Sequence, residues 1–232
     1  MAKKIAILQS NYIPWKGYFD LMSQVDEFII FDEVQYTKGD WRNRNLIKTA
    51  QGLKWLTIPI MKSNSLQQRV CEIQVSDAVW RKKHWQSLIT NYSKAPYFKT
   101  YSDFFETLYL ENNESILSKI NVSFMTLIKQ ILGISTVLTW SSDYSFSRGK
   151  TARLVQLCLD CGADEYVSGP SAKDYVDQSL FDEAGIKLSW MDYSGYQPYH
   201  QLFSTFEHRV SAVDLIFNEG PNSKRFLKSF SS

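Results

Sequence analysis

A short pattern near the start of the chain places the strongest limit on the fold. Residues 4–9 form an apolar run, a helical stretch follows over residues 18–24 behind Pro14 and Gly17, and residues 27–31 form a second apolar run. A strand, a helix and a strand within about 30 residues are typical of a parallel crossover unit. The alternation returns at residues 137–140, 151–161, 165–168, 172–184 and 187–190. The pattern predicts an α/β fold with a mainly parallel, Rossmann-like sheet and helices on both of its faces.

The middle of the chain departs from this alternation. Residues 45–48, 54–60 and 69–75 are predicted to form an antiparallel ribbon arm attached to the sheet. Helices are predicted over residues 77–91, 97–110 and 114–132, and a further helical stretch over residues 212–218. Because no linker, repeat or shift in composition interrupts the chain, residues 1–232 are interpreted as a single domain with a helical insertion at about residues 77–133.

Composition excludes several classes of protein. Lys and Arg total 26 against 24 Asp and Glu, a formal charge of +2, which lacks the basic excess of a nucleic-acid-binding protein. No apolar run reaches the roughly 20 residues of a membrane-spanning helix, and the first residues do not form a secretory signal. Three cysteines argue against a disulfide framework. We therefore expect a cytoplasmic protein and do not expect nucleic acid as its partner.

The residues after each predicted strand are the first candidates for a site, because ligands of open parallel sheets bind beyond the carboxyl ends of the strands. Gln9, Asn11 and Tyr12 follow the first strand, Asp32, Glu33 and Gln35 the second, and Ser168, Gly169 and Lys173 a later one. A polar cluster by itself is more often a solvated loop, and a serine N-cap explains the last group as well as a phosphate site does. The recurrence of such clusters predicts a site for a polar, anionic or nucleotide-linked ligand.

Residues 36–48 interleave aromatic, cationic and amide side chains. They include Trp41, Arg42, Asn43, Arg44 and Asn45. Arginine offers a rigid fork of donors for phosphate or carboxylate, asparagine offers a donor and an acceptor, and tryptophan offers a stacking face. A solvated hairpin arm is the alternative. Single-stranded nucleic acid would use similar chemistry, but the small net charge favours a pocket.

Other candidates carry less information. Cys158 and Cys161 lie inside a predicted amphipathic helix and are interpreted as buried structural cysteines. His208 precedes Asp214 by six positions, so the two could form an acid–base pair only if the turn between them folds back. No spacing of ligands predicts a metal site, and no motif identifies a cofactor.

Several segments together resemble the WbqC-like protein family. They are Q-S-N-Y-I-P-W-K-G-Y-F at residues 9–19, D-E-V-Q-Y at 32–36, W-R-N-R-N at 41–45 and W-L-T-I-P at 55–59, with Y-x-S-G at 166–169 and the tail from Asp214 in the same pattern. Ser10 stands where the family usually has proline, which we expect to loosen the first loop. Members occur with bacterial O-antigen and other surface-polysaccharide genes. The resemblance implies transfer of a glycyl or other acyl group to an amino sugar, without naming catalytic residues.

The leading hypothesis is a transferase that moves an aminoacyl or acyl group onto a nucleotide-linked amino sugar. The base would be Asp32 or His208, with Asp214 as a partner of the histidine. Arg42, Arg44 and Asn43 would hold the diphosphate, and Trp15 or Trp41 would stack on the base or the sugar. A second hypothesis is an activating enzyme of the adenylyl-transfer type, which would use Lys16 or an arginine to stabilise the phosphoryl transition state. A third is a non-catalytic protein that binds a nucleotide-sugar or a carrier.

Overall fold

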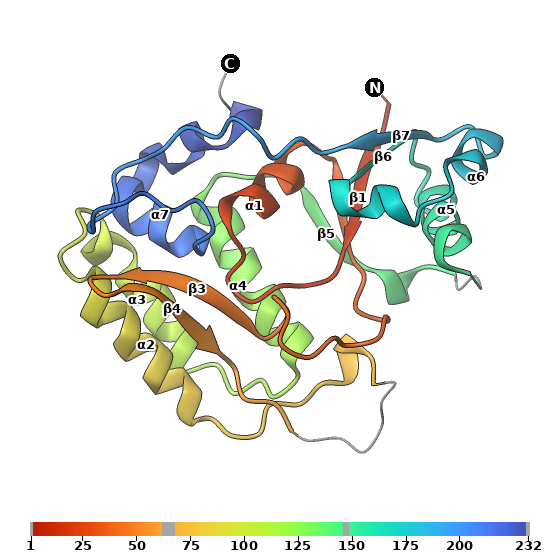
Figure 1. Cartoon of the computed structure of the whole chain (residues 1–232). Coiled ribbons are helices and arrows are strands. Elements are labelled where there is room, and N and C mark those ends of the chain that lie inside the picture. Colours follow the sequence, from red (N-terminus) through yellow and green to blue (C-terminus); the bar gives the residue numbers. More distant parts are fainter. Residues whose placement is uncertain (1, 62–67, 146–148, 231–232) are drawn as a thin grey trace.

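A five-stranded parallel sheet forms the centre of the computed structural model, which describes residues 2–61, 68–145 and 149–230 (Figure 1). Its strands are β1 (Lys4–Leu8), β2 (Glu27–Ile30), β5 (Val137–Trp140), β6 (Glu165–Ser168) and β7 (Lys187–Trp190). They lie in the order β5-β2-β1-β6-β7, and neighbouring strands pair in parallel. The α/β fold predicted from the sequence is thus confirmed. The chain builds outward from β1 to β2 and β5, then continues on the opposite side with β6 and β7, so the topological switch point lies between β1 and β6.

Both faces of the sheet are buried, which explains why β1 and β2 read as continuous apolar runs. Successive side chains of a strand point to opposite faces, so Ala6 and Phe28 join the larger core while Ile5 and Ile29 join the smaller one. The larger core receives side chains from α1 (Lys16–Ser23), α2 (Val79–Tyr92), α3 (Phe98–Leu110), α4 (Leu117–Ile131) and α7 (Ala212–Glu219). The smaller core receives them from α5 (Lys150–Asp160) and α6 (Gln178–Glu183).

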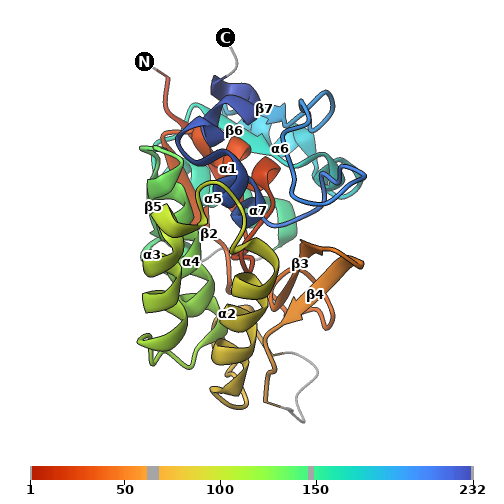
Figure 2. The same cartoon turned by 90° about the vertical axis from the view of Figure 1, so that its left-hand side faces the viewer.

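The ribbon arm is shorter than predicted. Strands β3 (Arg44–Thr49) and β4 (Gly52–Thr57) form a two-stranded antiparallel sheet beside α2 (Figure 2). The predicted third strand at residues 69–75 is wrong, because Val70–Glu72 forms a 3-10 helix. The backbone N–H groups of Val70 and Cys71 donate to the carbonyl groups of Val34 and Asp32. The 3-10 helix therefore satisfies its hydrogen bonds against the loop after β2, while Gln74 and Val75 form only isolated antiparallel bridges, with Ile116 and Ile60.

The continuous helix predicted over residues 172–184 is also wrong. A 3-10 helix covers Pro170–Asp174, and α6 begins only at Gln178. Pro170 stands in the first turn of the 3-10 helix, and the side chain of Asp177 accepts the N–H of Ser179 and caps α6. An aspartate at an N-cap position favours the start of a new helix there and disfavours one helix that runs through that position.

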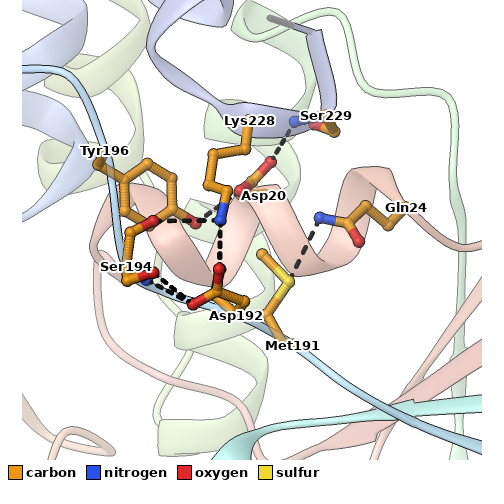
Figure 3. Close-up of polar contacts among 8 residues, drawn as sticks. All are labelled: Asp20, Gln24, Met191, Asp192, Ser194, Tyr196, Lys228 and Ser229. Atoms are coloured by element: carbon orange, nitrogen blue, oxygen red, sulfur yellow. Dashed lines mark hydrogen bonds and ion pairs between the residues drawn. The ribbon is translucent and has the colours of Figure 1, made fainter.

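Polar contacts fasten the segment after β7 and the end of the chain to α1 (Figure 3). Asp20 on α1 accepts hydrogen bonds from the hydroxyl of Tyr196, at 2.5 Å, and from the backbone N–H of Ser229, at 2.9 Å. The Lys228 ammonium pairs with Asp192 at 2.9 Å. The segment after β7, which has no regular secondary structure, is thus placed against the first helix, next to the loop that follows β1.

Candidate functional site

A cavity of about 880 Å³ opens at the carboxyl ends of β1, β2 and β6, at the topological switch point. Parallel α/β sheets bind their ligands at this position. The residues with charged, amide or serine side chains that line it are Gln9, Asn11, Glu33, Gln35, Arg42, Lys150, Arg153, Ser168 and Ser171, and Gly149 and Gly169 also line it. We call this space the larger cavity.

Cationic groups outnumber carboxylates around the larger cavity. Arg42, Lys150 and Arg153 line it together with one carboxylate, that of Glu33. Arg153 pairs with Glu33 at 3.0 Å and lies over the ring of Phe31 at 4.6 Å. Arg42 pairs with Asp40 at 2.9 Å, so Lys150 carries the surplus positive charge of the site. A surplus of positive charge in a concave site favours an anionic ligand.

Helix α5 adds backbone donors to the same region. It begins at the wall of the larger cavity, where Gly149 and Lys150 are lining residues. Gly149 has a φ of +95°, a conformation that side chains rarely tolerate. The N–H groups of a first helical turn and the positive end of the helix dipole both attract phosphate.

Buried hydrogen bonds fix the loop after β1 to the loop after β2 and to α4. The N–H of Ser10 donates to Asp32 at 2.8 Å, and Asp32 also accepts the hydroxyl of Ser118 on α4. The amide of Asn121 donates to the Ser10 hydroxyl at 3.1 Å and to the carbonyl of Arg42 at 2.8 Å. The expectation that serine loosens this loop is therefore wrong, because its N–H and hydroxyl both fix the loop to α4 and to the loop after β2.

The same loop contains a strained residue. Ile13 has a φ of +37°, which is rare for a β-branched residue and costs about 1–3 kcal/mol. The side-chain amide of Asn45, which is 2% exposed, donates to the carbonyls of Tyr12 and Ile13, each at 3.0 Å. Asn45 thus holds the bend that directs Asn11 and Trp15 toward the ligand-binding side.

A second space of about 180 Å³, the smaller cavity, adjoins the first. Its lining residues are Asn11, Pro14, Trp15, Trp41, Asn45 and Arg209. Asn11 lines both cavities, so the two spaces share this residue.

The sequence matches the family model described as the WbqC-like protein family over residues 9–226. The chain belongs to the WbqC-like family. It is also 50% identical over 226 residues to the uncharacterized protein Rv1507c of Mycobacterium tuberculosis, a match that covers 97% of this chain and 98% of that protein. No solved structure matches the chain. The resemblance drawn from the motif segments is confirmed, and all residues of both cavities except Ile7 and Leu8 lie within the matched range.

The structure of this WbqC-like protein brings together part of the predicted binding set. Gln9, Asn11, Gln35, Arg42, Ser168 and Gly169 line the larger cavity, and Trp15, Trp41 and Asn45 line the smaller one together with Asn11. Five others lie elsewhere. Tyr12 is in the core, Asn43 is buried and donates to the carbonyl of Ile58, Arg44 lies against the ring of Trp55 at 4.2 Å, Lys173 lies over Trp190 at 5.6 Å, and Lys16 is described below.

None of the three predicted catalytic residues lines either cavity. Asp32 is buried beneath the loop after β1, and burial raises its pKa. Asp214 is also buried, with a raised pKa, and accepts hydrogen bonds from Tyr92 and Tyr199, both at 2.8 Å. His208 packs against Phe206, with 4.5 Å between the ring centroids. Asp32 and Asp214 thus accept hydrogen bonds inside the fold and do not face a cavity.

Lys150, Arg153 and Arg209 were not among the predicted site residues, and Glu33 was a candidate only as part of the polar cluster after the second strand, with no role assigned. Glu33 follows Asp32 in the chain, and consecutive residues in extended backbone point in opposite directions, so only one of the two can face the cavity. Lys150 and Arg153 stand on α5 at the spacing of one helical face. Two cationic residues at this spacing, on a helix that follows a predicted strand, are the signal in the sequence that could have identified them. Arg209 lies in a segment that carries no such pattern.

Lys16 lies outside both cavities, in an aromatic cage. Its ammonium is 5.0 Å from the ring of Tyr196 and 5.1 Å from that of Tyr199, and it donates to the carbonyl of Gln197 at 3.0 Å. Burial lowers the pKa of Lys16 to about 8. This lysine serves the packing of the segment after β7.

The lowered pKa of Lys16 predicts a pH effect on stability. Between about pH 8 and pH 10 the folded state binds fewer protons at this site than the unfolded state, so raising the pH stabilises the fold. Relative to Lys16→Met, the wild-type free energy of unfolding should rise by up to about 1.4 kcal/mol per pH unit across this range. Urea titrations of both proteins at several pH values measure the difference. A difference that does not change with pH would contradict the prediction.

No metal site emerges from the part of the chain that the structure describes, where no three His, Cys, Asp or Glu side chains cluster suitably. Within the same residues, no helix combines the length and apolar character needed to cross a bilayer.

Proposed function

We propose that this protein is a transferase of bacterial surface-polysaccharide biosynthesis that binds a nucleotide-linked amino sugar in the larger cavity and adds an aminoacyl or other acyl group to the sugar amine. The observation that carries the proposal is the position of a cationic cavity at the switch point of the sheet, against the start of α5. The family's association with surface-polysaccharide genes supplies the class of sugar.

The lining of the larger cavity suits the parts of such a ligand. Apolar and aromatic side chains, among them Ile7, Leu154 and Tyr166, line it beside the backbone of β1, β6 and α5, and a nucleobase needs such a surface. Arg42, Lys150 and Arg153 supply charge for a diphosphate. Gln9, whose amide oxygen accepts from Arg42, and Asn11 also line the larger cavity, and their amide groups offer hydrogen bonds to sugar hydroxyl groups.

Acyl transfer to an amine needs a proton acceptor. The amine nitrogen attacks the acyl carbonyl carbon, a C–N bond forms, the bond from that carbon to the leaving group breaks, and the amine proton passes to a base. Glu33 is the carboxylate among the residues that line the larger cavity, and the hydroxyl of Ser141 holds it at 3.0 Å. We therefore assign the role of base in this proposal to Glu33.

Ligand-dependent melting tests the proposed ligand. UDP-glucosamine should raise the melting temperature, because a ligand that binds only the folded state stabilises it. Lys150→Gln should weaken this ligand about tenfold by removing one charged contact to phosphate. Lys99→Gln, on α3 and outside the lining of both cavities, is the matched control and should bind as the wild type does.

The other results of this experiment are equally informative. A shift with ATP but with no sugar nucleotide would contradict the proposal and favour an activating enzyme of the adenylyl-transfer type. Binding of a sugar nucleotide without turnover with any acyl donor would favour a non-catalytic binding protein. Equal affinity in Lys150→Gln and wild type would remove the larger cavity from the ligand site.

A further inference from the structure

The smaller cavity has a chemical character different from that of the larger one. Two indole rings, of Trp15 and Trp41, and the ring of Pro14 form its apolar walls. Arg209 is the one charged residue that lines it. Glu207 binds the Nε and Nη2 atoms of Arg209, each at 3.2 Å, and no described residue bonds to Nη1. The guanidinium is thus oriented, with one nitrogen left for a ligand.

The indole of Trp15 is fixed before any ligand binds. It meets the rings of Tyr193 and Tyr196 edge to face, with centroid distances of 5.3 and 5.8 Å. Tyr196 is itself held by Asp20 (Figure 3). On its other side the indole lies over Gly17, where a Cβ atom would come within 2.3 Å of it. Only glycine leaves room for the ring in this position.

Trp41 is placed by a second aromatic contact. Its ring lies against that of Trp55, with 5.4 Å between the centroids and 40° between the planes. Its backbone carbonyl accepts the N–H of Tyr12 at 3.0 Å, which ties the turn before β3 to the loop after β1. The two indole walls therefore come from different parts of the fold and are both held in place, an arrangement that reduces the entropy lost on binding a ring.

Asn11 supplies an unsatisfied acceptor at the junction of the cavities. Its side-chain oxygen is buried and has no hydrogen-bond partner among the described residues. A buried acceptor left without a donor costs about 1–3 kcal/mol, and such groups call for an explanation. Because this oxygen is covered in the structure, the Asn11 side chain must turn before a ligand N–H or O–H group can satisfy it.

We infer that the smaller cavity is a second binding site, for a ring-shaped group that carries a negative charge. The ring lies between the indole walls, the anion pairs with Nη1 of Arg209, and a donor on the ligand binds Asn11. The inference stands on residues separate from the cationic wall of the larger cavity, so it goes beyond the proposed function. In a transferase this site would take part of the second substrate. A sugar acid and an aromatic carboxylate share this chemistry.

Titrations with small probes test the inference. Glucuronate and benzoate are compared with their neutral counterparts, glucose and benzyl alcohol, by ligand-observed NMR on the full chain. We expect at least one acid to bind at least tenfold more tightly than its neutral counterpart. Arg209→Gln and Trp41→Leu should each weaken that acid at least tenfold. Arg69→Gln is the matched control, because Arg69 is also an exposed arginine paired with a nearby glutamate, Glu72 at 2.6 Å, and lines neither cavity.

The outcomes separate the two sources and the two cavities. Selective binding of glucuronate supports a sugar acid, and selective binding of benzoate supports an aromatic carboxylate. Failure of both acids to bind, equal binding of the neutral probes, or unchanged affinity in Arg209→Gln would overturn the inference. A loss in Lys150→Gln as large as that in Arg209→Gln would also overturn it, since the acid would then occupy the larger cavity.

Gly17→Ala gives an independent check. The added methyl group must displace the Trp15 indole, so acid binding should fall at least tenfold while UDP-glucosamine still raises the melting temperature. Unchanged acid binding in a folded Gly17→Ala protein would overturn the role of Trp15. If this variant does not fold, the exposed residue Arg209 still decides the question, because its substitution leaves the core untouched.

Discussion

Replacing Asp32 with alanine is expected to lower the free energy of unfolding by about 3–5 kcal/mol. Asp32 is 1% exposed and accepts the backbone N–H of Ser10 and the hydroxyl of Ser118. The hydroxyl of Ser118 can turn toward a carbonyl of its own helix, but the N–H of Ser10 is fixed in the loop. Alanine therefore leaves a buried donor without a partner. Chemical denaturation with urea measures the loss.

The neighbouring carboxylate provides the contrast. Glu33→Gln should change the free energy of unfolding by no more than about 1 kcal/mol, because Glu33 lies at the cavity and its ion pair with Arg153 is partly solvated. It should retain UDP-glucosamine binding and lose acyl transfer, since an amide cannot accept the amine proton. An Asp32→Ala protein as stable as the wild type would contradict the structural role of Asp32, and a Glu33→Gln protein with full transfer activity would contradict the role of Glu33 as the base.

This pair shows where reasoning from sequence reaches its limit. The apolar runs of β1 and β2 and the polar residues that follow them are visible in the sequence, because strands buried on both faces have little polarity. Which of Asp32 and Glu33 faces the cavity depends on which face of the sheet the last side chain of β2 points to. A strand that is apolar on both faces shows no alternation of polar and apolar residues from which this direction could be predicted.

The loop after β1 raises the same difficulty. Asn11 lines both cavities, whereas the next residue, Tyr12, is fully buried and bonds through its hydroxyl to His84 and Tyr109, at 2.9 and 2.6 Å. Asn11 and Tyr12 are adjacent polar residues in the sequence, and the prediction therefore places both in the site. The strained bend at Ile13, which follows them, depends on Asn45 more than 30 positions away, and no local pattern predicts such a partner.

Residues from the end of the chain are harder still to predict. Arg209 reaches the smaller cavity because the segment after β7 packs on α1 through contacts such as Tyr196 with Asp20. This contact joins positions 176 residues apart. A segment without periodicity gives no indication of its docking position, so the cluster of aromatic residues there could be seen in the sequence while its role as a support for Trp15 could not.

Replacing Asn45 with alanine is expected to disable both cavities at once. Asn45 satisfies the carbonyls of Tyr12 and Ile13 and accepts the N–H of Leu46 at 2.8 Å. Without it, three buried backbone groups lose their partner, and the free energy of unfolding should fall by about 2–4 kcal/mol. The strained φ of Ile13 would no longer be compensated, so the loop should relax and carry Asn11 and Trp15 away from their positions.

Asn43→Ala is the matched control for this prediction. Asn43 is a buried asparagine two residues earlier, and its side-chain amide donates to the carbonyl of Ile58 at 2.9 Å and makes no bond to the loop after β1. It should lose about 1–2 kcal/mol of stability and keep both binding activities. Asn45→Ala, measured below its melting temperature, should bind UDP-glucosamine and the acid probe at least tenfold more weakly. Equal binding by the two variants would mean that the bend at Ile13 stores strain without positioning the ligand-binding residues. A loss confined to the acid probe would place the nucleotide-sugar site entirely on β2, β6 and α5, since those elements do not depend on Asn45.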